Sequence, residues 1–239
     1  MKIGHFTNNP QIQSKATSLS NEDAGLRAYM QKIYAYMTIG LAITGSIAFF
    51  LPTTELGQNI MRSPASFIAM IAPIGIVLFL ASRINTMKAS TAQNMFWVLS
   101  ACYGIFFASI FMMYTTESVA RVFFISSSTF LAASIYGYTT KKSLANFGSF
   151  LIMGLIGIII AMVVNIFLQS TMMQFIISIV GVLIFTGLTA YDTQTLKEMY
   201  VAGEEGETQV KKAVMGALKL YLDFINLFIM LLMLLGNRR

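Results

Sequence analysis

The sequence predicts an all-α integral membrane protein with seven transmembrane helices. Three observations support this fold class: 56% of the 239 residues are hydrophobic, only 11% are charged, and the apolar residues gather in long segments. Soluble domains carry roughly 25% charged residues, so this chain has too few charges to cover a water-facing surface. The mean hydropathy of +0.70 supports the same conclusion.

Six segments contain no Asp, Glu, Lys or Arg, and a seventh is interrupted only by Asp223. Each is close to the ~20 residues that a helix needs to cross a ~30 Å hydrocarbon core. Strands of a membrane barrel are excluded, because they would show alternating polarity and no segment here alternates. The expected helices are Ile33–Leu51, Phe67–Ser82, Met95–Tyr114, Val122–Tyr138, Leu144–Leu168, Met172–Tyr191 and Leu220–Gly236.

The rest of the chain divides into a tail and short connections. Residues 1–25 are expected to form a polar cytoplasmic tail, and residues 26–239 a single seven-helix transmembrane domain. Two connections are longer than the others, Pro52–Ser66 and Lys197–Lys212. The second carries three glutamates between residues 204 and 207, flanked by glycines. We interpret them as a solvated loop face and not as a cation cage.

The distribution of basic residues predicts the orientation. With seven helices and a cytoplasmic N-terminus, twelve of the sixteen Lys and Arg residues fall on the cytoplasmic side. The positive-inside rule therefore favours an outside C-terminus. The pair Arg238 and Arg239 disagrees with this, and it leaves open a last segment that re-enters and returns to the cytoplasm. Membrane topology explains the net charge of +6, so the charge calls for no nucleic-acid partner.

Two aspartates are the main candidates for function, because an ionisable residue in hydrocarbon is costly. Asp192 ends the sixth expected helix, and Lys197 follows it five residues later. Asp223 lies early in the seventh helix, four residues after Lys219. At 1.5 Å per residue, each carboxylate is roughly 6–8 Å from its flanking lysine along the helix axis. The two aspartates are therefore expected at a similar depth, within the cytoplasmic half of the membrane.

Two carboxylates in a shared low-dielectric site cannot both ionise cheaply, so the pair should titrate as a unit near physiological pH. Arg83 ends the second helix at the same level, and it is a candidate latch that pairs with an ionised aspartate. Asn226, three residues after Asp223, is a candidate supporting ligand. Structural roles stay open: Asp223 pairing with Lys219 on one helix face, a local hydrogen bond of Asp192, and Arg83 reaching the headgroups. The matched depth favours function.

Four segments resemble the Bax-inhibitor family, the transmembrane Bax inhibitor motif proteins, and especially its bacterial branch. Together they span most of residues 70–236, and the longest two are the most specific. Neither aspartate departs from the family pattern. The segments are SRINTM, FLAASIYGYTTKKSLANFGSFLIMGLIGIIIAMVVN, FTGLTAYDTQTLK and ALKLYLDFINLFIMLLMLLG.

The resemblance implies that the last helix is central and surrounded by the other six, in a bacterial inner membrane. It also implies a pH-sensitive calcium leak, with calcium as the transported ion and no cofactor. The family's aspartate pair falls on Asp192 and Asp223, and its latching arginine on Arg83. Two carboxylates with Asn226 are too few ligands for a tight calcium site, and weak binding suits passage. A uniport leak and a proton-coupled exchanger are both open.

Two other functions remain as alternatives. One is a non-conducting regulator that binds a membrane-protein partner such as a membrane protease, a role known for other members of the family. The other is an intramembrane aspartyl protease, which the Tyr191-Asp192 pair would fit. The second half of that signature is missing, since no glycines precede Asp223 and no proline follows Pro73. No phosphate loop, zinc spacing or serine triad is present, and we expect no enzyme activity.

Overall fold

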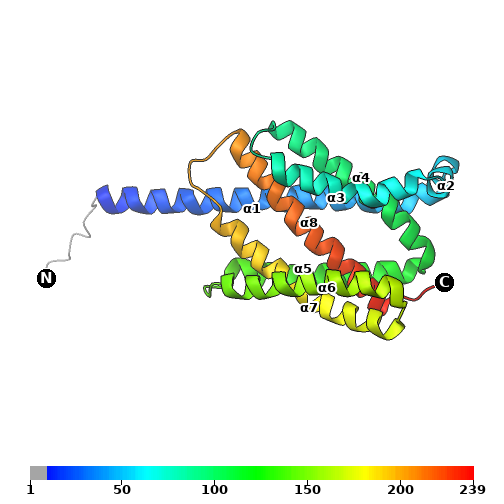
Figure 1. Cartoon of the computed structure of the whole chain (residues 1–239). Helices are drawn as coiled ribbons and strands as arrows, with labels where there is room; N and C mark the ends of the chain where they lie inside the picture. The colour runs from blue at the N-terminus through cyan, green and yellow to red at the C-terminus, as the bar shows by residue number, and fades with distance from the viewer. Residues whose placement is uncertain (1–9) are drawn as a thin grey trace.

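Figure 1 shows a computed structural model, which describes the backbone of residues 10–239 and the side chains of residues 22–64, 67–68 and 71–239. Within this part of the chain the fold is all-helical, with no strand. The expected all-α class is therefore confirmed. The elements are α1 (Pro10–Phe50), a 3-10 helix η1 (Leu51–Thr53), α2 (Glu55–Arg62), α3 (Ala65–Arg83), α4 (Ala89–Met113), α5 (Thr116–Thr139), α6 (Ala145–Leu168), α7 (Thr171–Glu198) and α8 (Glu207–Leu235).

Among the described residues, six helices are long and apolar enough to cross a membrane: α1, α4, α5, α6, α7 and α8. The expected number of seven is not confirmed, because within the described residues α3 contributes only a shorter apolar helix, Ile71–Arg83. Several helices extend beyond their expected bounds. Residues 10–25 of the expected tail belong to α1, and α8 begins at Glu207 instead of Leu220. The hydropathy pattern marks only the part in hydrocarbon, whereas a helix can continue into the polar region.

The connection Pro52–Ser66 contains a short helix that the sequence pattern did not reveal. In α2, the hydroxyl of Thr54 accepts a hydrogen bond from Gly57 N at 3.0 Å, which caps the helix N-terminus. Glu55 lies in the first turn and Arg62 in the last, where their charges complement the helix dipole. With eight residues, α2 is too short to span a membrane.

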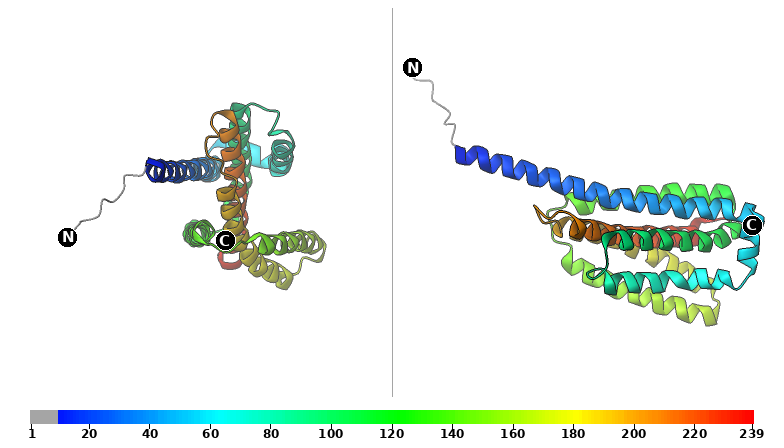
Figure 2. Two further views of the ribbon diagram at one scale, coloured as in Figure 1. Left: turned by 90° about the vertical axis from the view of Figure 1, so that its left-hand side faces the viewer. Right: turned by 90° about the horizontal axis from the view of Figure 1, so that it is seen from above.

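The last helix is the centre of the bundle (Figure 2). Its most apolar stretch is 61% buried, against 11% for α6. The helices α1, α4, α5 and α7 pack extensively against α8, while α3 packs on α4 and α6 packs on α7. The expectation that six helices surround the last one therefore needs correction: four surround α8, and α3 and α6 lie outside them. Lipid can solvate the remaining faces of α3 and α6, so neither helix needs a protein partner on every side.

The helix α1 begins and the helix α8 ends at opposite ends of the bundle (Figure 1). Residues 237–239 pair with the α4–α5 turn: Thr115 N donates to Asn237 O at 3.1 Å, and Arg239 N donates to Met113 O at 3.0 Å. The end of the bundle that holds the α4–α5 turn is called the far end. The opposite end, where α7 ends and α8 begins, is called the basic end. Because α8 is continuous over 29 residues and finishes at the far end, the re-entrant alternative is wrong.

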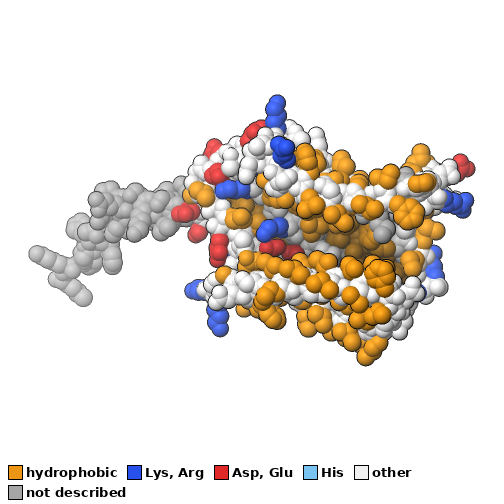
Figure 3. All heavy atoms as spheres, in the orientation of Figure 1, with side chains coloured by type: hydrophobic (Ala, Val, Ile, Leu, Met, Phe, Trp, Pro, Cys, Tyr) orange, Lys and Arg blue, Asp and Glu red, His pale blue; other side chains and the backbone are white. Residues whose placement is uncertain are grey.

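The surface matches a membrane environment. Figure 3 shows hydrophobic side chains over the middle of one face and most charged side chains towards its two ends. Large apolar side chains are widely exposed, such as Phe124 at 70% and Phe167 at 82%. Water would not tolerate so much exposed apolar surface on a monomer, whereas a hydrocarbon core would.

The α5–α7 contact depends on Gly137, so enlarging this residue should destabilise the fold. A Cβ at Gly137 would lie 2.1 Å from Ala190 O, whereas a Cβ at Gly157 in α6 meets nothing within 4 Å. We expect Gly137→Ala to cost about 1–3 kcal/mol, because backbone must move to relieve the overlap. The matched control Gly157→Ala should leave the midpoint of thermal unfolding in detergent unchanged or higher. Equal midpoints for both variants would contradict the close contact.

Candidate functional site between helices α7 and α8

The two aspartates face each other across the central helix pair. Asp192 lies near the basic end of α7 and Asp223 lies in α8, and their carboxyl groups are close enough to interact electrostatically. Asp223 is only 6% exposed. The sequence predicted equal depth, and the structure adds that the two side chains are lateral neighbours. One proton between two such carboxyls would satisfy both of them.

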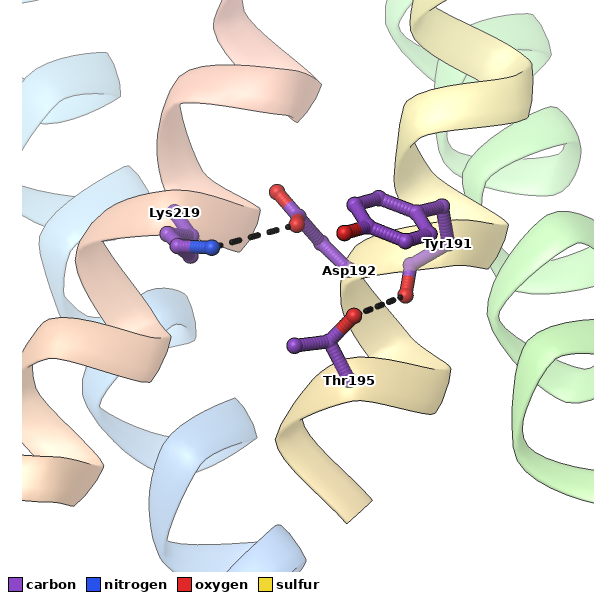
Figure 4. Close-up of polar contacts among 4 residues, drawn as sticks. All are labelled: Tyr191, Asp192, Thr195 and Lys219. Atoms are coloured by element: carbon purple, nitrogen blue, oxygen red, sulfur yellow. Dashed lines mark hydrogen bonds and ion pairs between the residues drawn. The ribbon is translucent and has the colours of Figure 1, made fainter. Parts of the chain in front are cut away.

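A lysine provides the nearest cation. Lys219 Nζ lies 3.3 Å from Asp192 Oδ1, so the ion pair bridges α8 and α7 (Figure 4). The Asp192 side chain is 13% exposed and that of Lys219 is 44% exposed. The sequence analysis used Lys219 to estimate the depth of Asp223, and it left open an ion pair between these two residues on one helix face. The structure instead places Lys219 against the aspartate of the neighbouring helix.

Asp223 is the less satisfied member of the pair. Its Oδ2 atom is buried and has no hydrogen-bond partner among the described residues, and the ion pair with Lys219 is made by Asp192. A buried carboxylate oxygen without a partner is costly when it is charged. A proton on this atom would lower that cost.

Among the described residues, no hydrogen bond or ion pair joins the other predicted site residues to the pair. Arg83 is exposed at the end of α3, and no ion pair joins it to an aspartate within the described part of the chain. The amide of Asn226 donates to Leu222 O of its own helix at 2.8 Å. The latch role of Arg83 and the supporting role of Asn226 therefore stay predictions, without a contact in this structure to support them.

The loop glutamates agree with a solvated face. Glu204 forms an ion pair with Lys212 at 2.6 Å, and both side chains are partly exposed. No group of three or more His, Cys, Asp or Glu side chains that could hold a metal occurs in the described residues. The weak calcium site expected at Asp192 and Asp223 stays a prediction.

Two polar side chains that the sequence analysis did not select hold Asp192 in place. Gln194 Oε1 accepts from Leu144 N at 2.7 Å, and its Nε2 donates to Lys142 O at 2.9 Å. Lys197 Nζ donates to Tyr138 O at 2.9 Å. These bonds tie the end of α7 to the α5–α6 turn and fix the depth of Asp192. The sequence contained a signal for these two residues, since a glutamine and a lysine follow Asp192 within five residues.

A third residue that the sequence analysis did not select anchors the other side of α8. Tyr221 is fully buried, and its hydroxyl lies 2.7 Å from Thr44 Oγ1 in α1. The same Thr44 hydroxyl lies 2.8 Å from Ser100 O in α4. One buried polar cluster thereby joins α1, α4 and α8, two residues away from Asp223. Hydrogen bonds between helices stabilise packing in lipid, where helices gain little from hydrophobic burial.

Comparison with known proteins gives the family of this chain. A family model described as "Inhibitor of apoptosis-promoting Bax1" matches residues 26–239. The chain belongs to the Bax inhibitor family, and the resemblance drawn from its four sequence segments is confirmed. The match begins where the polar tail was predicted to end.

Bacterial proteins are similar over nearly the whole chain. The inner membrane protein YbhL of Escherichia coli K12 is 40% identical over 232 residues, which cover 94% of this chain and 98% of that protein. The uncharacterized protein RP147 of Rickettsia prowazekii is 44% identical over 218 residues, covering 91% and 92%. A relative from Borreliella burgdorferi is 44% identical over 214 residues, covering 88% and 92%. The expected location, integral in a bacterial inner membrane, is confirmed.

The aspartate pair should respond to removal of one charge. In Asp223→Asn, the new amide can donate to Asp192, and the unpartnered buried charge is gone. We expect a stability gain of about 1–3 kcal/mol at about pH 8 and a smaller gain at about pH 5, because a proton taken up by the wild-type pair would remove the same repulsion. Thermal unfolding midpoints in detergent at both pH values measure this. A midpoint below wild type at both pH values would contradict charge repulsion in the pair.

Proposed function

We propose that this Bax inhibitor family protein is a pH-sensitive calcium leak channel, gated by Asp192 and Asp223. The observation that carries the proposal is the facing pair of carboxyl groups inside a membrane bundle. Ionisable residues in such a place commonly mark ion pathways and proton relays. The family resemblance supports calcium as the transported ion. We further propose that the protein acts without enzyme activity or a cofactor.

The proposed topology has seven spans and a cytoplasmic basic end. At 1.5 Å per residue, the 19 residues of α3 extend about 28 Å, close to the thickness of a hydrocarbon core. Counting α3 as a span makes the helices α3 to α8 alternate in direction. The positive-inside rule then assigns the basic end to the cytoplasm, and the aspartates to the cytoplasmic half.

Charge balance suggests how the site works. The Lys219 ammonium group neutralises Asp192, so an entering calcium ion must displace it and binds weakly. Weak binding permits release, which conduction requires. Protonation of the carboxyl pair removes the negative charge that attracts calcium and loosens the ion pair with Lys219. A uniport leak and a proton-coupled exchange both use these steps.

The decisive experiment is calcium flux into liposomes that hold the purified protein, from about pH 6 to about pH 8, where such a pair should titrate. Wild-type flux should change with pH, and Asp192→Asn or Asp223→Asn should flatten the profile. Glu198→Gln, an exposed carboxylate later on α7, is the matched control and should behave as wild type. Folded, inserted protein without flux at any pH would refute the channel and favour the regulator that binds a membrane-protein partner.

A second experiment distinguishes Lys219 from Arg83 as the cation that pairs with the aspartates and acts as the latch. Lys219→Met removes the charge that contacts Asp192, and we expect faster calcium flux near neutral pH because the ion no longer competes with an ammonium group. Lys212→Met, which breaks the loop ion pair with Glu204, is the control and should leave flux unchanged. If Arg83→Gln raises flux and Lys219→Met does not, the latch is Arg83 and the Lys219 assignment is wrong.

A further inference from the structure

A cavity opens between α1 and α5 on the side of α8 away from α7. It has a volume of about 550 Å³ and is lined by residues of α1, η1, α4, α5 and α8. This size lies within the range of small-molecule sites, roughly 300–1,000 Å³. Both α1 and α5 pack on α8, yet they are not among the helix pairs that pack extensively against each other. Figure 2 shows them apart on the same side of α8.

The cavity wall is apolar and aromatic. Its floor consists of buried side chains, among them Phe107, Phe224 and Phe228. Its rim includes the exposed Phe49 and Phe124. Because such side chains face lipid and not water in a membrane protein, the opening faces the bilayer. A hydrocarbon chain is the occupant that matches both the wall and the surroundings.

Polarity changes along the cavity. The hydroxyl of Thr44, deep in the cavity, is hydrogen-bonded to Tyr221, so it is a poor hydrogen-bonding group for a ligand. At the far end, the cavity is bordered by Thr53, Thr116 and Arg239. The Arg239 guanidinium lies 3.4 Å from Thr116 Oγ1 through one nitrogen, which leaves its other donors free for an anion. A guanidinium beside a hydroxyl is well suited to a phosphate group.

The depth of the cavity matches one leaflet. Its lining on α1 runs from Leu41 to Phe49, which is roughly 12 Å at 1.5 Å per residue. Half of a ~30 Å hydrocarbon core is ~15 Å. The far end also carries an excess of positive charge among the described residues, with Arg62, Arg121, Arg238 and Arg239 against Glu55 and Glu117.

We propose that this cavity is a binding site for a phospholipid of the leaflet at the far end. One acyl chain lies among the phenylalanines between α1 and α5, and the phosphate contacts Arg239. The site is separate from the aspartate pair, because Asp223 faces α7 whereas its neighbours Phe224 and Ile225 line the cavity.

Two glycines provide a matched test. Gly45 lines the cavity, and a Cβ there meets nothing within 4 Å; the same is true of Gly75 in α3, which lies outside the cavity. Gly45→Phe should therefore place its ring in the cavity, since no atom blocks its Cβ, and Gly75→Phe adds the same side chain elsewhere. Native mass spectrometry of delipidated full-length protein with dioleoyl phosphatidylglycerol measures the one-to-one complex.

We expect Gly45→Phe to weaken this complex about tenfold or more, while Gly75→Phe binds like wild type. Gly45→Leu serves if the phenylalanine variant does not fold. Arg239→Gln should weaken phosphatidylglycerol but not dioleoylglycerol, which lacks phosphate, and Arg238→Gln should affect neither. Equal binding by wild type and a folded Gly45 variant would overturn the site. Equal binding of both lipids by wild type would overturn the phosphate contact. Competition by inorganic phosphate, together with no effect of Gly45→Phe, would show an anion site alone and would overturn the acyl-chain site.

Discussion

The burial of α8 among four other helices is the constraint on which the rest of this structure depends. In lipid, helices gain little from hydrophobic burial, so they associate by close packing and hydrogen bonds. Gly216 permits such packing, since a Cβ there would lie 2.9 Å from side-chain atoms of Ile33 and Leu196. Gly181 in α7 gives room to Met230 in the same way. Tyr221 adds a buried hydrogen bond to α1.

This packing also makes a buried aspartate tolerable. A helix at the centre keeps Asp223 away from lipid and brings it to Asp192 on α7, while Lys219 reaches Asp192 from the same side. The hydrogen bonds of Gln194 and Lys197 hold the end of α7 against the α5–α6 turn. The polar groups of the site are thus positioned by bonds that have no direct part in binding an ion or a proton.

Two faces of α8 have different surroundings, one polar and one apolar. Asp223 faces α7 and the polar pair, whereas Phe224 and Ile225 face the apolar cavity between α1 and α5. Successive residues of a helix point about 100° apart, so three consecutive residues are enough to serve both sides. A ligand in the cavity would therefore contact the same turn of helix that carries the aspartate.

The sequence by itself determined the class of the protein, most of its helices and the depth of the aspartates, because hydropathy and helical rise are local properties of the chain. It also determined the family. Only the tertiary structure decided which groups meet at a given depth: Lys219 with Asp192 instead of Arg83, Tyr221 with Thr44, and four neighbours for α8 instead of six. The reason is physical: a helix pattern fixes position along the membrane normal, while lateral neighbours depend on packing details that no single segment contains.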